Sequence, residues 1–195
     1  MIVAPIKAKI PRIVVLGDTS VGKTSILNRL MQGAFDENAA ATTSAAFFFY
    51  QPPAEDDVQD LQIWDTAGME QYRSLNSLYY RNASAALLVF DVTSPSSFAS
   101  LDKWHTDFVS NGPLQDLVVL AGNKSDLDFA VDKDLVNLWC EKHHTKCFYT
   151  SAKSGENIND LFVYLSKIVP SLSESQEPEC VILEKPSEPS KKFCC

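Results

Sequence analysis

The residues whose types and spacing most clearly suit a chemical function form one run near the N-terminus, in the pattern G-x-x-x-x-G-K-T. The run consists of Gly17, Asp18, Thr19, Ser20, Val21, Gly22, Lys23 and Thr24. Glycines let such a loop curl until successive backbone N–H groups point at phosphate oxygens. Lys23 would then reach the terminal phosphates of a nucleotide, and the Thr24 hydroxyl would bind Mg²⁺. The run predicts a nucleotide-phosphate site rather than an ordinary surface turn.

A second polar group follows the apolar segment 117–122 and indicates which base is bound. It consists of Asn123, Lys124, Ser125 and Asp126. The Asp126 carboxylate can accept hydrogen bonds from both N1–H and the 2-amino group of guanine, whereas adenine offers neither donor. A third group, Ser151, Ala152 and Lys153, follows the segment 147–150 and can supply a backbone donor to the guanine O6. Together with the phosphate loop, these groups indicate a guanine nucleotide.

The segment Trp64-Asp65-Thr66-Ala67-Gly68 completes the chemistry expected around the phosphates. An aspartate at the end of a strand, such as Asp65, suits Mg²⁺ ligation through a water molecule. Gly68 has no side chain, so its N–H can approach a γ-phosphate closely. An ordinary turn between a strand and a loop is the alternative interpretation of this segment.

Short apolar runs alternate with helical patterns along residues 10–169, and these elements must position the polar groups. The runs 13–16, 61–64, 85–90, 117–122 and 147–150 are typical of strands buried on both faces of a parallel sheet. Apolar residues three or four apart predict amphipathic helices, among them one carrying Leu135, Leu138 and Trp139. The segments 46–50 and 58–64 are too close for a helix between them and predict an antiparallel edge hairpin. The order predicts a doubly wound α/β domain.

Length, composition and charge indicate how the chain is organised and which partners it excludes. The chain has 195 residues, 45% of them hydrophobic, and a formal net charge of −8. An acidic chain gains nothing from counterion release, so nucleic acid is not an expected partner. We expect a short extension at 1–9, one monomeric domain at 10–170 and a disordered tail at 171–195. The longest apolar run is too short to span a bilayer.

The motifs, taken in this order, resemble the Ras superfamily of small GTPases and, more closely, the Rab family of vesicle-traffic GTPases. Further matches are YYR at 79–81, DVT at 91–93 and SF at 97–98, and ATTSAAF at 41–47 resembles the early-endosomal branch. The resemblance covers residues 10–170. It implies a three-layer P-loop fold with a six-stranded, mostly parallel sheet, one antiparallel edge hairpin and helices on both faces. It also implies GTP or GDP and Mg²⁺ as ligands.

Several residue roles follow from the resemblance alone. Thr42 matches a threonine of the first switch that binds Mg²⁺ and senses the γ-phosphate, and Phe35 matches an aromatic residue that packs against the base. Ser25 joins the nucleotide-binding residues. Phe47, Trp64 and Tyr79 match an aromatic triad presented to effectors, although plain core packing is the alternative for each. Implied partners are an exchange factor, a GTPase-activating protein, effectors, a prenylation escort and a GDP-dissociation inhibitor.

Met69 is the main departure from the family pattern. The family normally has glutamine after DTAG, and this glutamine orients the attacking water. A thioether donates no hydrogen bond, so Met69 cannot position that water. The resemblance implies that the catalytic positions are Lys23, Thr42, Gly68 and Met69. Because Met69 stands at the glutamine position, we expect very slow intrinsic GTP hydrolysis. Three interpretations remain open: a hydrolysing switch, a GTP-loaded scaffold with negligible turnover, and a P-loop phosphotransferase.

The last two residues, Cys194 and Cys195, resemble the doubly geranylgeranylated ending of Rabs. Two lipid chains are what stable anchoring requires, because one chain binds a membrane only marginally. Lys191 and Lys192 lie beside them, where they can meet anionic lipid. We therefore expect the protein on the cytoplasmic face of intracellular membranes, endosomal ones above all, with an extracted cytosolic pool.

Overall fold

A six-stranded sheet forms the centre of the protein in the computed structural model, which describes residues 10–37, 42, 46–54, 57–65, 80, 82–111 and 117–169. The strands are β1 (Arg12–Leu16), β2 (Ala46–Tyr50), β3 (Leu61–Asp65), β4 (Ala85–Asp91), β5 (Val118–Asn123) and β6 (Cys147–Thr150), and their spatial order is β2-β3-β1-β4-β5-β6. The pair β2–β3 is antiparallel and lies at one edge, and all other neighbours are parallel. The predicted mixed sheet with an antiparallel edge hairpin is confirmed.

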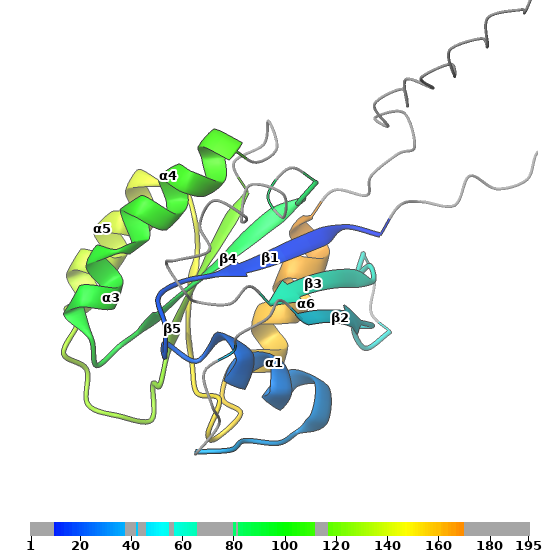
Figure 1. Ribbon diagram of the computed structural model, residues 1–195, viewed down its shortest axis with the longest axis horizontal. Coiled ribbons are helices and arrows are strands. Elements are labelled where there is room, and N and C mark those ends of the chain that lie inside the picture. Colours follow the sequence, from blue (N-terminus) through cyan, green and yellow to red (C-terminus); the bar gives the residue numbers. More distant parts are fainter. Residues whose placement is uncertain are drawn as a thin grey trace, which may run out of the picture.

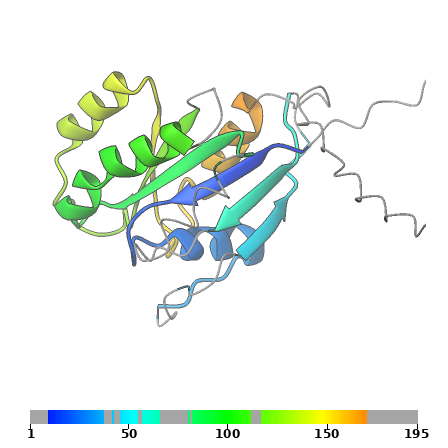
Figure 2. The same cartoon turned by 45° about the horizontal axis from the view of Figure 1, so that its top comes forward.

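Helices cover both faces of this sheet, which gives three layers (Figure 1). They are α1 (Lys23–Gln32), α3 (Pro95–Ala99), α4 (Leu101–Asn111), α5 (Lys133–Lys142) and α6 (Ile158–Ile168). The turned view in Figure 2 shows α4 and α5 on one side of the sheet and α1 on the other. Along β1, Ile13 and Val15 contact the core beneath α1 and α6, whereas Val14 and Leu16 contact the core beneath α4 and α5. Because successive side chains alternate between faces, a strand buried on both faces must be apolar throughout.

The helix α5 is where the predicted core differs from the structure. The predicted helix is confirmed, but Leu135 and Leu138 are 53% and 60% exposed, while Val136 and Trp139 are buried. The indole N–H of Trp139 donates to Asp102 Oδ1 on α4 at 3.0 Å. Val136 and Trp139 both belong to the core beneath α4 and α5, so these two positions of the helix face inward.

The topology brings the polar groups together at one edge. Parallel strands end at the same edge of a sheet, so the segments after β1, β5 and β6 must be neighbours, and β3 ends there at Asp65. Within the described residues, no helix has the length and apolar character needed to cross a membrane. The predicted extension 1–9 and tail 171–195 lie outside the described residues.

Candidate nucleotide-binding site

The loop between β1 and α1 has a backbone that glycine alone fits at two positions. Gly17 and Gly22 have φ angles of 145° and 96°, and Ser20 between them is also left-handed at 65°. A Cβ at Gly17 would collide with the carbonyl oxygen of Val89, and one at Gly22 would collide with Asn123 Nδ2. Substitution at either glycine is therefore opposed by both backbone conformation and space.

Lys23, the first residue of α1, closes this loop. Its ammonium donates to the carbonyl oxygens of Gly17 at 2.8 Å and Asp18 at 2.6 Å. The side chain is buried, and burial lowers the Lys23 pKa to about 8, against the opposing attraction of Asp65 and Asp18. Among the described residues, this buried ammonium donates its hydrogen bonds to two carbonyl oxygens, and an anion beside it would favour its charged form. This is what the predicted phosphate contact requires.

Three oxygen-bearing side chains from separate segments converge next to Lys23. Thr24 Oγ1 donates to Asp65 Oδ2 at 2.6 Å, and Thr42 Oγ1 lies 2.5 Å from Thr24 Oγ1. Since Thr24 has one hydroxyl proton, Thr42 must be the donor in the second contact. The residues predicted to hold Mg²⁺ are therefore brought together, although Thr42 is separated from Thr24 by 18 positions.

The environment of the Asp65 carboxylate indicates whether a cation fits beside Thr24 and Thr42. Asp65 is fully buried, and its Oδ1 has no hydrogen-bond partner within the part of the chain that the structure describes. Burial raises the Asp65 pKa, while the Thr24 hydrogen bond and the Lys23 charge lower it. An unpartnered, desolvated carboxylate oxygen beside two hydroxyl oxygens is a hard donor set of the kind that Mg²⁺ prefers. The donor set fits the predicted ion, with Asp65 able to act through water.

Asn123, at the end of β5, joins three segments of the site. Its Nδ2 donates to Val21 O at 2.9 Å, and its Oδ1 accepts from Ala152 N at 3.3 Å and Thr150 Oγ1 at 3.4 Å. Only 1% of Asn123 is exposed. The residue therefore fixes the phosphate loop to the segment after β6 at the expected sheet edge.

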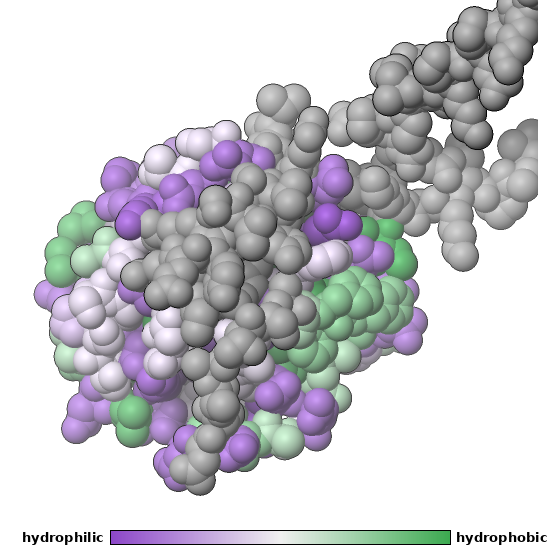
Figure 3. Space-filling model, in the orientation of Figure 1, coloured by the Kyte–Doolittle hydropathy of each residue, from purple (hydrophilic) through white to green (hydrophobic). Residues whose placement is uncertain are grey.

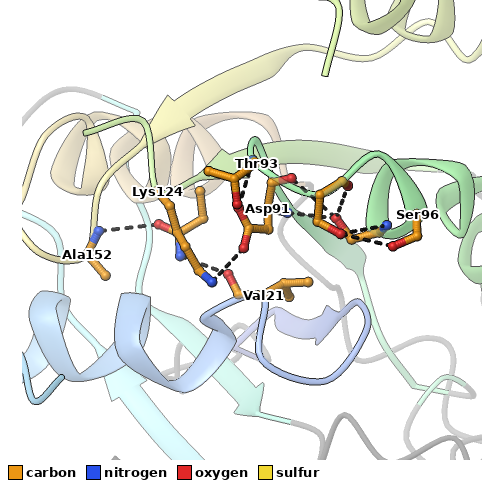
Figure 4. Close-up of polar contacts among 9 residues, drawn as sticks. Val21, Asp91, Thr93, Ser96, Lys124 and Ala152 are labelled. Carbon is orange, nitrogen blue, oxygen red and sulfur yellow. Dashed lines mark hydrogen bonds and ion pairs between the residues drawn. The ribbon is translucent and has the colours of Figure 1, made fainter. Parts of the chain in front are cut away.

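Lys124 adopts a left-handed backbone, with φ 66°, and its side chain lies alongside the same junction. Its ammonium pairs with Asp91 Oδ2 at 2.5 Å, as Figure 4 shows between Val21 and Ala152. Asp91 also accepts from the Thr93 backbone and hydroxyl, at 2.8 and 2.7 Å. These partners outweigh desolvation and lower the Asp91 pKa. Sequence reasoning noted the DVT motif but gave Asp91 no role.

Asp126 is exposed, so its carboxylate is accessible to a ligand. Its Oδ1 accepts from Ser151 Oγ at 2.6 Å, and Ser151 Oγ in turn accepts from Ser154 N at 3.0 Å. The predicted guanine-recognition groups around Asn123 and Ser151 are thus connected directly. Phe35 is half-buried and packs against the core beneath α1 and α6.

Trp104 on α4 is a site residue that sequence reasoning missed. Its indole N–H donates to Asp18 Oδ1 in the phosphate loop at 2.8 Å, and the side chain is almost fully buried. A buried indole usually finds a hydrogen-bond partner. That rule signals a contact for Trp104, but only the fold identifies Asp18 as the acceptor.

Phe47 and Trp64, two of the three predicted effector residues, lie on the edge hairpin in β2 and β3. The Phe47 and Trp64 rings meet edge to face at 5.6 Å, and Arg12 covers Trp64 at 4.7 Å. Phe47 is 52% exposed, and Phe49 on the same side of the strand is 39% exposed. Figure 3 shows apolar surface gathered over this hairpin. This exposure argues against plain core packing, the alternative interpretation of Phe47. The remaining predicted residues, Tyr79, Gly68, Met69, Cys194 and Cys195, lie outside the described residues.

Comparisons with known proteins agree with this geometry. The sequence pattern described as the Ras family matches residues 12–171. Ras-related protein Rab5 of Nicotiana tabacum is 37% identical over 94% of both chains. Ras-related protein Rab-22A of Homo sapiens is 35% identical, over 94% of this chain and 97% of its own. Ras-related protein Rab-31 of Homo sapiens is 36% identical, over 94% and 96%. The chain therefore belongs to the Ras family, as a small GTPase of the Rab group.

Proposed function

We propose that this small GTPase is a Mg²⁺-dependent switch of endosomal vesicle traffic that hydrolyses GTP slowly. The contact between Thr42 and the Thr24–Asp65 pair carries the proposal. It joins the segment before β2 to the group suited to Mg²⁺, so a change in the bound phosphates can move that segment and the exposed hairpin beyond it. Effectors would read the hairpin surface around Phe47 and Trp64.

In this proposal the nucleotide lies along the sheet edge. Backbone N–H groups of the phosphate loop and the Lys23 ammonium bind the phosphates, and Mg²⁺ contributes charge neutralisation there when bound. Asp126 and the backbone of residues 151–153 recognise guanine, with Asn123 holding both segments in register. Gly68 would contact the γ-phosphate.

The Met69 side chain determines whether the switch turns itself off. Replacing Met69 with glutamine is expected to raise the single-turnover rate of GTP hydrolysis at least about tenfold, because the amide can orient the attacking water. The measurement is the phosphate released from GTP-loaded, purified protein. Met69→Leu, which is apolar and similar in size, is the matched control and should stay slow.

The same assay separates the switch from a GTP-loaded scaffold. Wild-type turnover that stays negligible even with an activating protein of the Rab class would favour the scaffold. A wild-type rate equal to that of Met69→Gln would contradict the proposed role of Met69. Phosphoryl transfer to a second substrate would need a lid and an acceptor pocket, and nothing among the described residues favours one.

The two C-terminal cysteines are proposed to carry geranylgeranyl groups. Replacing both Cys194 and Cys195 with serine is expected to move the protein entirely into the cytosolic fraction of cells, since no acyl chain remains to partition into the bilayer. Cys180→Ser changes a cysteine of the same tail and should leave the membrane fraction unaltered. Membrane binding by the double variant would refute the anchor.

A further inference from the structure

Arg29, on the last turn of α1, donates hydrogen bonds to three backbone carbonyl oxygens around the end of the site. Nε donates to Ala152 O at 2.7 Å, Nη2 to Lys153 O at 2.5 Å and Nη1 to Gly33 O at 2.6 Å. The side chain is half-buried. Because the guanidinium is planar, its three charge-assisted hydrogen bonds fix the directions of the three carbonyl oxygens as well as their distances from Arg29. Arg29 therefore holds the 151–153 segment against α1.

The carbonyl groups of Ala152 and Lys153 affect the orientation of the backbone beyond them, because each peptide unit is planar. In a trans peptide the carbonyl and the following N–H point in opposite directions, so holding one aims the other. Through Ala152 O, Arg29 directs the N–H of Lys153 away from α1. Through Lys153 O, it directs the N–H of Ser154, which donates to Ser151 Oγ at 3.0 Å.

The Ser154 contact continues to the base-recognition carboxylate. Ser151 Oγ accepts from Ser154 N and donates to Asp126 Oδ1 at 2.6 Å. A chain of hydrogen bonds therefore runs from the Arg29 guanidinium, through the 153–154 peptide and the Ser151 hydroxyl, to Asp126. Bonds in such a chain polarise and strengthen one another.

We propose that Arg29 is a positioning residue for guanine recognition, which it controls by orienting Asp126 and the 151–153 backbone from outside the base site. The inference rests on the proposed function, since it assigns the base to these groups. It gives α1 two roles, with Lys23 at its start acting on the phosphates and Arg29 near its end acting on the base.

A nearby ion pair supplies a matched control. Lys153 Nζ lies 3.3 Å from Glu37 Oε1, with the two side chains 56% and 76% exposed. This pair also joins the segment after α1 to the 151–153 segment, but exposed ion pairs contribute little. Glu37→Gln should therefore leave nucleotide binding unchanged.

The test compares GDP with inosine diphosphate, which lacks the 2-amino group that Asp126 would recognise. The dissociation rate of each nucleotide from the full-length protein is measured with Mg²⁺ present. In Arg29→Met, GDP release is expected to accelerate at least about tenfold, and the preference for GDP over inosine diphosphate to shrink by a similar factor, because a misaligned carboxylate loses its charge-assisted bond. Arg29→Lys, which can reach one carbonyl, should lie between wild type and Arg29→Met.

The ratio of the two rates distinguishes positioning from a structural role. If Arg29 merely stabilised α1, both nucleotides would leave faster by the same factor, and an unchanged ratio in Arg29→Met would overturn the inference. Should Arg29→Met not fold, as judged by circular dichroism, the same ratio in Arg29→Lys decides. A wild-type protein with no preference for GDP would instead refute the proposed function.

Discussion

Replacing Asn123 with alanine is expected to lower GDP affinity by about 100-fold or more and the free energy of unfolding by about 3 kcal/mol. The amide is buried and bridges the phosphate loop, β6 and the segment after it. Its removal leaves Val21 O and Ala152 N without these partners, and each unsatisfied buried group has a cost. Isothermal calorimetry gives the affinity, and urea unfolding gives the stability.

An asparagine elsewhere on the fold is the control for this substitution. Asn137 is exposed on α5, and Asn137→Ala should change neither quantity. An Asn123→Ala variant that is destabilised but binds GDP as tightly as wild type would contradict the role of Asn123 in the site. The affinity is therefore compared at temperatures where circular dichroism shows both variants folded.

Replacing Lys23 with methionine is expected to reduce GDP and GTP affinity by at least about 100-fold, because the phosphates lose a buried, charge-assisted donor. Methionine has a similar length and no charge, so packing changes little. Fluorescent nucleotide binding measures the loss. Lys142→Met removes an exposed lysine on α5 and should bind as wild type does.

The same substitution also predicts a change in how stability depends on pH. In the nucleotide-free protein, the Lys23 pKa is lowered to about 8 from its ordinary value of 10.5 by burial. Below pH 8 the lysine is charged in both states, and the folded state bears the cost of the buried charge. Between pH 8 and 10.5 the folded state has lost the proton while the unfolded state keeps it, so stability rises with pH.

The wild-type protein should therefore gain stability relative to Lys23→Met across this window, by on the order of 3 kcal/mol in total. The difference between the two urea unfolding curves isolates Lys23, because all other groups titrate in both proteins. A difference that stays constant from pH 7 to 10.5 would show that the Lys23 pKa is not lowered.

The sequence was sufficient to predict those parts of the site that depend on local backbone. The phosphate loop has glycines where the backbone is left-handed or closely approached, so spacing alone predicts the curl. Asn123 and Asp65 each end a strand recognisable by its apolar run, and parallel strands end at one edge. For Thr42 only the resemblance assigned a role, and the structure then places it beside Thr24.

Partners separated along the chain could not be predicted in the same way. No local sequence pattern indicates that Arg29 binds the carbonyl oxygens of Ala152 and Lys153, which lie more than a hundred positions further along the chain. The same is true of the hydrogen bond from Trp104 to Asp18. On α5, apolar residues occupy more of the circumference than the sheet can cover. Periodicity therefore predicted the helix and the buried Trp139, but it also chose the exposed Leu135 and Leu138 and passed over Val136, which is buried.

The most direct test of the whole account is the nucleotide content of the purified full-length protein, measured by chromatography after denaturation. We predict a stoichiometric amount of guanine nucleotide, no adenine nucleotide, and loss of the nucleotide when Mg²⁺ is chelated before a desalting step. Adenine nucleotide in the site, or a folded protein that neither carries nor takes up guanine nucleotide, would contradict the account.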